Sequence, residues 1–125
     1  MNKKSNDNET QILVDSIIAG MQENKADNIV ILDLREIENS ICDFFIVCSG
    51  ESSTQVDGIS KSIKRYTMEE ILEKPWRIEG EKNSEWILLD YCNVVVHVFH
   101  KEKRKFYELE DLWADAKRTD ISNLN

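Results

Sequence analysis

The chain has 125 residues, of which 41% are hydrophobic and 32% charged, and its formal net charge at pH 7 is −8. The length and composition predict one folded domain, and no apolar run approaches the roughly 20 residues of a membrane span. The acidic balance argues against broad nucleic-acid binding, which needs a field that attracts phosphates, and favours a partner with a basic surface.

The first half of the chain predicts one helix and two strands. Residues 1–7 are polar and are expected to be disordered. An amphipathic helix follows, whose inner stripe is formed by Ile12, Leu13, Ile17 and Met21. Residues 28–35 have the pattern of a strand, and a loop over 36–43 precedes the run 44–48, which is apolar at every position. Such a run is typical of a strand buried on both faces, so we expect it in the middle of the sheet.

The second half predicts a helix, three strands and a final helix. Ser52 and Gln55 have the spacing of a capping box, which starts a helix that ends before Pro75. Three strands are then expected, over residues 76–79, 84–91 and 94–99. The last two form a hairpin that turns at residues 92 and 93. The final helix begins near Glu102, with an inner stripe of Phe106, Leu109 and Trp113.

These elements predict an α/β fold with a five-stranded mixed sheet flanked by helices. The second strand, its helix and the third strand are expected to form a right-handed parallel crossover, while the other strands can pair antiparallel. Residues 119–125 are polar and are expected to be a disordered tail. A single domain over residues 8–118 remains.

Cysteines and histidines in the chain raise the question of metal binding or nucleophilic catalysis. The candidate ligands are Cys42, Cys48, Cys92, His97 and His100. Their spacing does not match the short ligand pairs of zinc sites, and no local signal indicates an oxyanion hole beside Cys48 or Cys92. Three cysteines give no paired disulfide framework, so small reduced thiols in a cytoplasmic protein are the expected state.

A glycine turn before the capped helix is a candidate phosphate site. Residues 49–52, Ser-Gly-Glu-Ser, lie between a strand and a helix start, where free backbone N–H groups can hold an anion. Nucleotidyltransferases use such a turn together with paired acids that bind metal ions. The nearest acids here are Glu79 and Glu81, which lack the Asp-x-Asp pattern. Ordinary helix capping by Ser52 explains the same residues.

The strand over residues 84–91 carries polar and aromatic residues that a core does not require. Trp86 and Asp90 have the same parity and therefore lie on one face of the strand. An aromatic side chain beside a carboxylate on a sheet face is a plausible anchor for a protein partner, although tryptophans at strand spacing are more often core residues. His97 fits a buried structural role as well as a contact role.

The same stretch resembles a known family. Trp86-Ile-Leu-Leu-Asp-Tyr91 and Val94-Val-Val-His-Val-Phe-His100, followed by Leu112-Trp113, closely resemble the ribosomal silencing factor family, also called Iojap-like. The resemblance covers about residues 10–116. Where the family commonly has Gly-Asp at the hairpin turn, this chain has Cys92-Asn93, so we expect Asn93 to take the left-handed conformation in place of glycine.

The resemblance implies a regulator and not an enzyme. It implies binding to the large ribosomal subunit through ribosomal protein number fourteen, steric block of small-subunit joining, repression of translation and a part in late large-subunit assembly. It also implies a homodimer when free, no cofactor, and a fold similar to a nucleotidyltransferase core without its catalytic acids. Complementary charge supports such a partner, because opposite fields speed and orient the encounter of an acidic domain with a basic protein.

From the family motif and the strand parity we expect a set of partner-binding residues. They are Glu79, Trp86, Asp90, Tyr91, His97, His100 and Arg104. The basic cluster over residues 101–105 can contact ribosomal RNA phosphates or form a solvated helix face. Two alternatives remain open: an enzyme that binds nucleotides at the turn over residues 49–53, and a dimeric scaffold with no ribosomal role.

Overall fold

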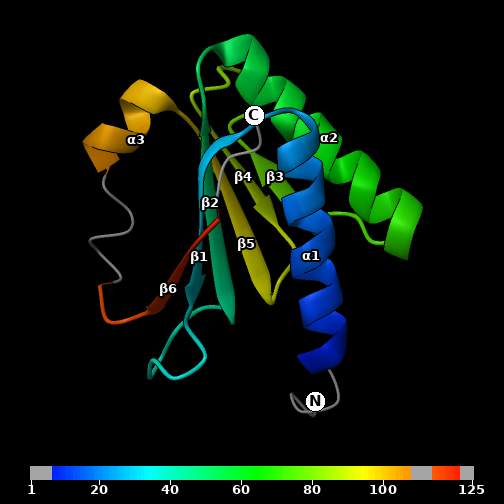
Figure 1. Cartoon of the computed structure of the whole chain (residues 1–125), viewed down its shortest axis with the longest axis vertical. Coiled ribbons are helices and arrows are strands. Elements are labelled where there is room, and N and C mark those ends of the chain that lie inside the picture. The colour runs from blue at the N-terminus through cyan, green and yellow to red at the C-terminus, as the bar shows by residue number, and fades with distance from the viewer. Residues whose placement is uncertain (1–6, 108–113, 122–125) are drawn as a thin grey trace.

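The computed structural model describes residues 7–107 and 114–121 (Figure 1). Its helices are α1 (Asp7–Glu23), α2 (Ser53–Ile71) and α3 (Lys101–Tyr107). Its strands are β1 (Asp27–Asp33), β2 (Phe44–Gly50), β3 (Arg77–Glu79), β4 (Trp86–Asp90), β5 (Val94–His100) and β6 (Lys117–Ile121). The predicted helices and strands are thus present in the predicted order. α1 begins at Asp7, one residue inside the stretch expected to be disordered, and Leu109 and Trp113 lie outside the described residues.

All the strands belong to one mixed sheet with the order β3-β4-β5-β2-β1-β6. β2 and β5 are parallel, and every other neighbouring pair is antiparallel. The predicted α/β class is confirmed, but the sheet has six strands and not five. The expected disordered tail is wrong for residues 119–121, which belong to β6. β6 is an exposed edge strand, so its polar composition looks like that of a solvated tail.

The predicted crossover does not join neighbouring strands. β2 is followed by α2 and β3, but β3 lies at the edge of the sheet beside β4, and the parallel neighbour of β2 is β5. The burial of the strands explains this order. β5 is buried from Val94 to Phe99, so it needs a neighbour on each side, whereas the three exposed or half-buried residues of β3 suit an edge.

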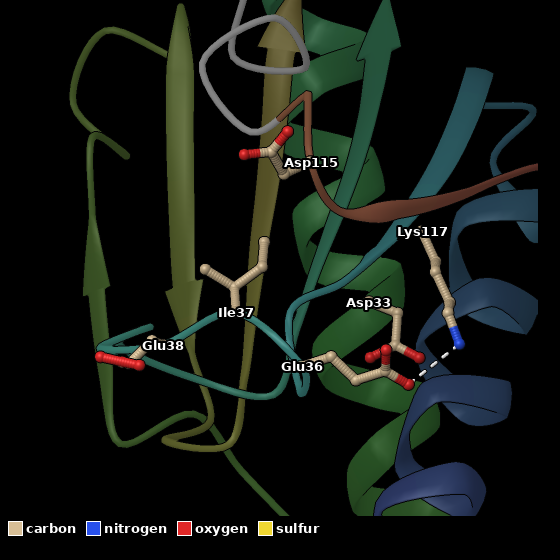
Figure 2. Close-up of a pocket in the computed structure, with 6 residues that line it drawn as sticks. All are labelled: Asp33, Glu36, Ile37, Glu38, Asp115 and Lys117. Carbon is tan, nitrogen blue, oxygen red and sulfur yellow. Dashed lines mark hydrogen bonds and ion pairs between the residues drawn. The ribbon is translucent and has the colours of Figure 1, made fainter.

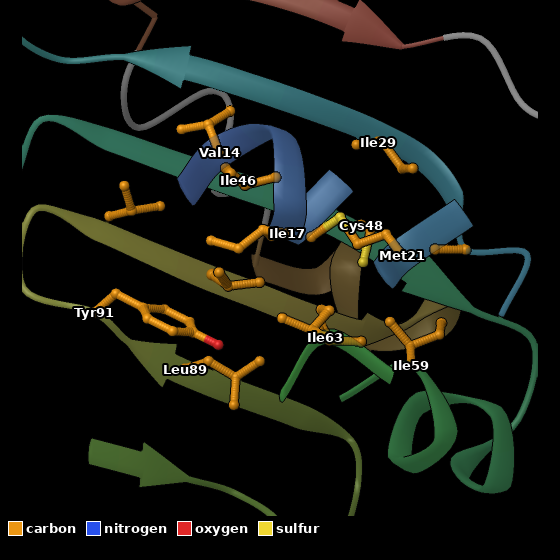
Figure 3. Packing of buried hydrophobic residues seen from close by; sticks show 14 of the residues in the cluster. Val14, Ile17, Met21, Ile29, Ile46, Cys48, Ile59, Ile63, Leu89 and Tyr91 are labelled. Carbon is orange, nitrogen blue, oxygen red and sulfur yellow. The ribbon is translucent and has the colours of Figure 1, made fainter. Parts of the chain in front are cut away.

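α1 and α2 cover one face of the sheet, and the larger core lies between these helices and that face (Figure 3). Alternate residues of β2 and β5, such as Ile46, Cys48, Val96 and Val98, point towards the helices. They meet helix residues that are fully buried, among them Ile17, Met21, Ile59 and Ile63. The predicted inner stripe of α1 is confirmed except for Ile12, whose side chain is 46% exposed.

The other face of the sheet carries a second apolar cluster. It is formed by Val30, Leu32, Phe45, Val47, Val95 and Phe99, together with Leu34 and Cys42 from the segment between β1 and β2. Trp86, Leu88, Ile37 and Ala116 pack against this cluster and are only partly buried. The second face is therefore closed over its centre and more open towards β4.

The hairpin between β4 and β5 turns at the predicted residues, but with a different left-handed residue. Cys92 has a φ of 76°, and Asn93 is absent from the positive-φ residues. The backbone N–H of Cys92 donates to Asp90 Oδ1 at 2.8 Å, and the Asn93 side chain donates to Thr10 Oγ1 at 2.6 Å. Asn93 is thus held by a hydrogen bond to α1, and Cys92 is the residue of the turn that adopts the strained left-handed conformation.

We expect the variant Cys92→Gly to be more stable than the wild type by about 0.5–1 kcal/mol. Glycine removes the cost of about 1–2 kcal/mol that a Cβ imposes on a left-handed residue, and part of this gain is offset by the freedom of glycine in the unfolded chain. Urea unfolding measures the difference. Cys92→Ala is the control, because it removes the thiol and keeps the Cβ. A glycine variant no more stable than the alanine variant would contradict this assignment of strain.

Candidate docking site

Residues of β3 and β4 form a continuous surface on the sheet face opposite α1 and α2. Trp86, Leu88 and Asp90 alternate along β4 and share one face. Register places Arg77 opposite Asp90 and Glu79 opposite Leu88. We call these five residues the β3–β4 surface. Three of the residues expected to bind a partner, Glu79, Trp86 and Asp90, are thereby brought together.

Trp86 is held in a fixed orientation within this surface. Its indole Nε1–H donates to His97 Nδ1 at 3.1 Å, and its ring stacks on Phe99 with the centroids 4.9 Å apart. Gly80 stands beside the Trp86 backbone with a φ of 88°, and a Cβ there would collide with the Trp86 carbonyl oxygen. A half-buried aromatic ring with so little freedom loses little entropy when a partner covers it.

The charges of the β3–β4 surface form a small network. The Arg77 guanidinium lies 3.1 Å from Glu79 Oε2 and 3.7 Å from Asp90 Oδ2. The Arg77 and Glu79 side chains are 61% and 57% exposed, so water screens these pairs and their contribution to stability is small. Two carboxylates around one guanidinium leave the surface with a net negative charge. Sequence reasoning missed Arg77, because only the register of β3 against β4 brings it to Asp90.

Tyr91 and His97, which we expected to contact a partner, are buried. Tyr91 lies on the helix side of the sheet, where its hydroxyl is 3.0 Å from Thr67 Oγ1, and burial raises the pKa of Tyr91 to about 12. His97 packs against Phe45 and Trp86, and burial lowers the pKa of His97 to about 4. His97 is therefore neutral at pH 7. His97 supports the β3–β4 surface from within, Tyr91 packs on the opposite face, and both have little area to offer a partner.

His100 and Arg104 lie near the start of α3 and not on the β3–β4 surface. His100 Nδ1 accepts a hydrogen bond from the Glu102 backbone N–H at 3.2 Å, at the beginning of α3. Arg104 donates to the Asn28 carbonyl oxygen at 2.6 Å and so ties α3 to β1. Of the basic cluster, Lys101 lies 2.8 Å from Glu51 and Lys103 lies 3.9 Å from Glu85. These contacts give both predicted residues a structural role.

The buried cysteines have neither the geometry nor the ionisation of nucleophiles. Burial raises the pKa of the Cys42 thiol and of the Cys48 thiol to about 12. Cys48 pairs with Val98, and both side chains point towards the helices. His97 pairs with Val47, whose side chain lies on the opposite face of the sheet, so His97 points away from Cys48. Within the described ranges, no group of three or more His, Cys, Asp or Glu side chains converges as a metal site requires.

The turn after β2 is occupied by its own capping contacts. Ser52 Oγ accepts from the Gln55 N–H at 3.1 Å, and Gln55 Oε1 accepts from the Glu51 N–H at 2.6 Å. The predicted capping of α2 is confirmed. Glu79 is the last residue of β3 and Glu81 follows this strand, which lies three strands from β2, or about 14 Å at the usual strand spacing. These acids are too far from the turn to share a metal ion with a phosphate bound there.

A pocket of about 340 Å³ lies near the end of β1 and the start of β6, away from the β3–β4 surface (Figure 2). It is lined by Asp33, Glu36, Ile37, Glu38, Asp115 and Lys117. Lys117 pairs with Glu36 at 3.0 Å, and a hydrogen bond from Arg35 lowers the pKa of Asp33. The acids of the pocket are thus partly neutralised by cations of the chain itself.

No helix of residues 7–107 is both long and apolar enough to cross a membrane.

The fold and the β3–β4 surface define a small mixed α/β domain with a candidate docking face on its sheet. The family model described as "Ribosomal silencing factor during starvation" matches residues 6–125. The chain belongs to this family. A "Ribosomal silencing factor RsfS" of Halalkalibacterium halodurans is 37% identical over 114 residues, which are 91% of this chain and 96% of the relative.

A solved structure and a more distant relative agree with the family. The crystal structure of a protein from Chromobacterium violaceum is similar with a TM-score of 0.78 and 30% identity, covering 83% of this chain and 85% of that chain. A mouse protein named "Mitochondrial assembly of ribosomal large subunit protein 1" is 26% identical over 102 residues, which are 80% of this chain and 44% of that protein. The names of the Halalkalibacterium halodurans and mouse relatives refer to ribosome silencing and to large-subunit assembly.

Proposed function

We propose that this protein is a cytoplasmic ribosomal silencing factor that acts by binding and not by catalysis. It binds the large ribosomal subunit through ribosomal protein number fourteen, occupies the place where the small subunit docks, and so represses translation. A part in late large-subunit assembly belongs to the same proposal. Family membership supports it, and so do the relatives named for ribosome silencing and for large-subunit assembly.

The observation that carries the proposal is the anchored Trp86 beside the exposed Glu79 carboxylate and the half-buried Asp90 carboxylate on an open part of the sheet. Tryptophan and arginine dominate the energetics of protein interfaces, and Trp86 and Arg77 lie on the same surface. The acids Glu79 and Asp90, together with the net charge of −8, suit a basic ribosomal protein. We place the contact on the β3–β4 surface and leave Tyr91 and His97 out of it.

Binding alone is sufficient for silencing. A competitor present at about 100 times its dissociation constant disfavours subunit joining by about 2.7 kcal/mol, which is close to a hundredfold. No reacting group is needed, and burial raises the pKa of the Cys42 and Cys48 thiols to about 12, which disfavours the nucleophilic thiolate. The enzyme alternative predicts binding of ATP and magnesium at the turn over residues 49–53. Calorimetry is expected to show no heat of binding there.

Replacing Trp86 by alanine is expected to weaken large-subunit binding about thirtyfold or more, the usual effect of a tryptophan hot spot of about 2 kcal/mol. Glu79→Lys is expected to weaken it about threefold to tenfold through lost charge complementarity, mainly in the association rate. Both effects are measured by co-sedimentation with large subunits over a range of protein concentrations.

The variant Glu79→Lys distinguishes a lost contact from a loss of folding. The Glu79 side chain is 57% exposed, so Glu79→Lys leaves the core intact, and thermal unfolding verifies this. Asp15→Lys is the matched control, because it makes the same charge change at an exposed position of α1. Unchanged co-sedimentation of the Trp86 and Glu79 variants would reject the β3–β4 surface as the contact.

A further inference from the structure

Large apolar side chains are exposed at the end of α2 and the start of β3. Met68, Leu72 and Trp76 are 40%, 83% and 79% exposed, and they lie within nine residues of one another. We call these three residues the α2–β3 corner. Among the residues that the structure describes, the other exposed large hydrophobics are Ile12 and Ile41, and they lie far from this segment in the sequence. Clustered exposed apolar side chains indicate an interaction site more strongly than scattered ones do.

Contacts between the end of α2 and the end of β4 hold the corner together. Tyr91 Oη lies 3.0 Å from Thr67 Oγ1, so the residue next to Met68 is fixed against the hairpin. The Trp76 backbone N–H donates to the Asp90 carbonyl oxygen at 2.7 Å, which places Trp76 beside the same hairpin. These exposed side chains therefore project from a backbone that is held in place by hydrogen bonds.

The backbone at Leu72 is strained to expose its side chain. Leu72 caps α2 in the left-handed conformation with a φ of 56°. Glycine is the usual residue at this position of a helix end, because a Cβ is disfavoured in the left-handed conformation. A leucine that is 83% exposed recovers little of this cost by packing in the free protein. Strain of this kind is typical of positions that serve a partner.

The charge around the corner is negative and opposes the stability of α2. Glu69 and Glu70 occupy the last helical turn, which contains no basic residue, and Glu73 follows. The C-terminal end of a helix already carries a partial negative charge, so acids there are unfavourable. Lys74 is the nearby cation, while Arg77 is engaged by Glu79 and Asp90. Such a rim fits a basic partner.

The corner adjoins the β3–β4 surface around the edge of the sheet. Trp76 directly precedes Arg77, and its backbone N–H donates to the carbonyl oxygen of Asp90, a member of the β3–β4 surface. β3 is an edge strand, and no strand of the described part of the chain pairs with its outer side. A partner that contacts this edge therefore meets Trp76 next to Arg77 and Glu79.

We propose that the α2–β3 corner extends the ribosomal contact around the edge strand β3 and receives an apolar side chain of the same basic large-subunit protein. This inference rests on the proposed function and adds to it a second half of the interface. Trp76 is the main contact of that apolar side chain, Met68 and Leu72 line the contact, and the acids of the last turn of α2 attract the basic residues of the partner around it.

Two variants test the corner without disturbing the fold. Trp76→Ser is expected to weaken large-subunit binding about tenfold or more. Leu72→Gly is expected to weaken binding about threefold while it maintains or raises the melting temperature, because glycine relieves the left-handed strain. A loss of binding together with a gain of stability separates a contact role from a structural one. Ile12→Ser, which removes exposed apolar surface from α1, is the matched control and is expected to bind like the wild type.

The outcomes separate this inference from the proposed function. If Glu79→Lys weakens binding while Trp76→Ser and Leu72→Gly bind within twofold of the wild type, the corner is not part of the contact, and the proposed function stands. If Trp76→Ser changes only self-association in sedimentation velocity, a second copy covers the corner, and the inference is overturned. If the wild type itself does not sediment with large subunits, both the function and this inference fail.

Discussion

Replacing Gly20 by valine is expected to lower the free energy of unfolding by about 3 kcal/mol, because α1 and α2 touch backbone to backbone at this residue. A Cβ at Gly20 would lie 2.8 Å from Ile63 Cα and 3.1 Å from the Ser62 carbonyl oxygen. Ser62 Oγ also donates to the Gly20 carbonyl oxygen at 2.8 Å, which ties the helices together at the same point. No side chain can move aside there, so the helices must separate.

Gly58 provides a control of opposite sign. It also lies in a helix, but its Cβ would meet the flexible Asn24 side chain and not a backbone. Gly58→Ala is therefore expected to be neutral or to stabilise by up to about 1 kcal/mol, the helix-propensity difference between glycine and alanine. Gly20→Ala is expected to destabilise despite the same gain. Urea unfolding of these variants gives the comparison, and equal effects at Gly20 and Gly58 would contradict the close helix contact.

Acidification is expected to destabilise the protein by about 3 kcal/mol through His97 alone. Burial lowers the pKa of His97 in the folded state to about 4, and the unfolded value is about 6.5. Between these two values the unfolded chain binds more protons than the folded one, so stability falls as the pH falls from 6.5 to 4. The hydrogen bond adds to the effect, because protonated Nδ1 can no longer accept from the Trp86 indole.

The variant His97→Phe isolates this contribution. Phenylalanine fits among Phe45, Trp86 and Phe99 and does not titrate. Carboxylates whose pKa is lowered by partners, such as Asp33 beside Arg35, also lose stability in acid, but they do so equally in both proteins. The difference in unfolding free energy between wild type and variant should therefore change by about 3 kcal/mol between pH 7 and pH 4. A difference that does not vary with pH would show that His97 is not buried in this way.

Local patterns predicted most elements of the fold, and non-local pairing accounts for what they missed. The apolar run at 44–48 predicted a central strand, and β2 is buried along its whole length between β5 and β1. No local pattern shows that the β4–β5 hairpin inserts between β2 and β3, since this depends on which strands need two neighbours. β6 escaped prediction because Lys117–Ile121 is a mostly exposed, polar edge strand that pairs with β1 alone.

The same distinction applies to the candidate site. Strand parity placed Trp86 and Asp90 on one face, as the structure has them. Strand parity also places Tyr91 on the opposite face, towards α2, as the structure has it. Tyr91 was expected to be a contact residue only because it belongs to the family motif. The hydrogen bond from Trp86 to His97 follows from the antiparallel register of β4 and β5, in which Leu88 and not Trp86 stands opposite His97. Such diagonal contacts are not visible in the sequence.

The most direct test of the account is a subunit-association gradient with and without this protein. Large and small subunits are mixed with an excess of the protein, and the fraction of joined ribosomes is read from the sedimentation profile. We expect the wild type to shift the profile strongly towards free subunits, and Asp15→Lys to do the same. Trp86→Ala, shown to be folded, is expected to leave joining close to that without protein. Normal joining in the presence of excess wild-type protein would contradict the proposed function.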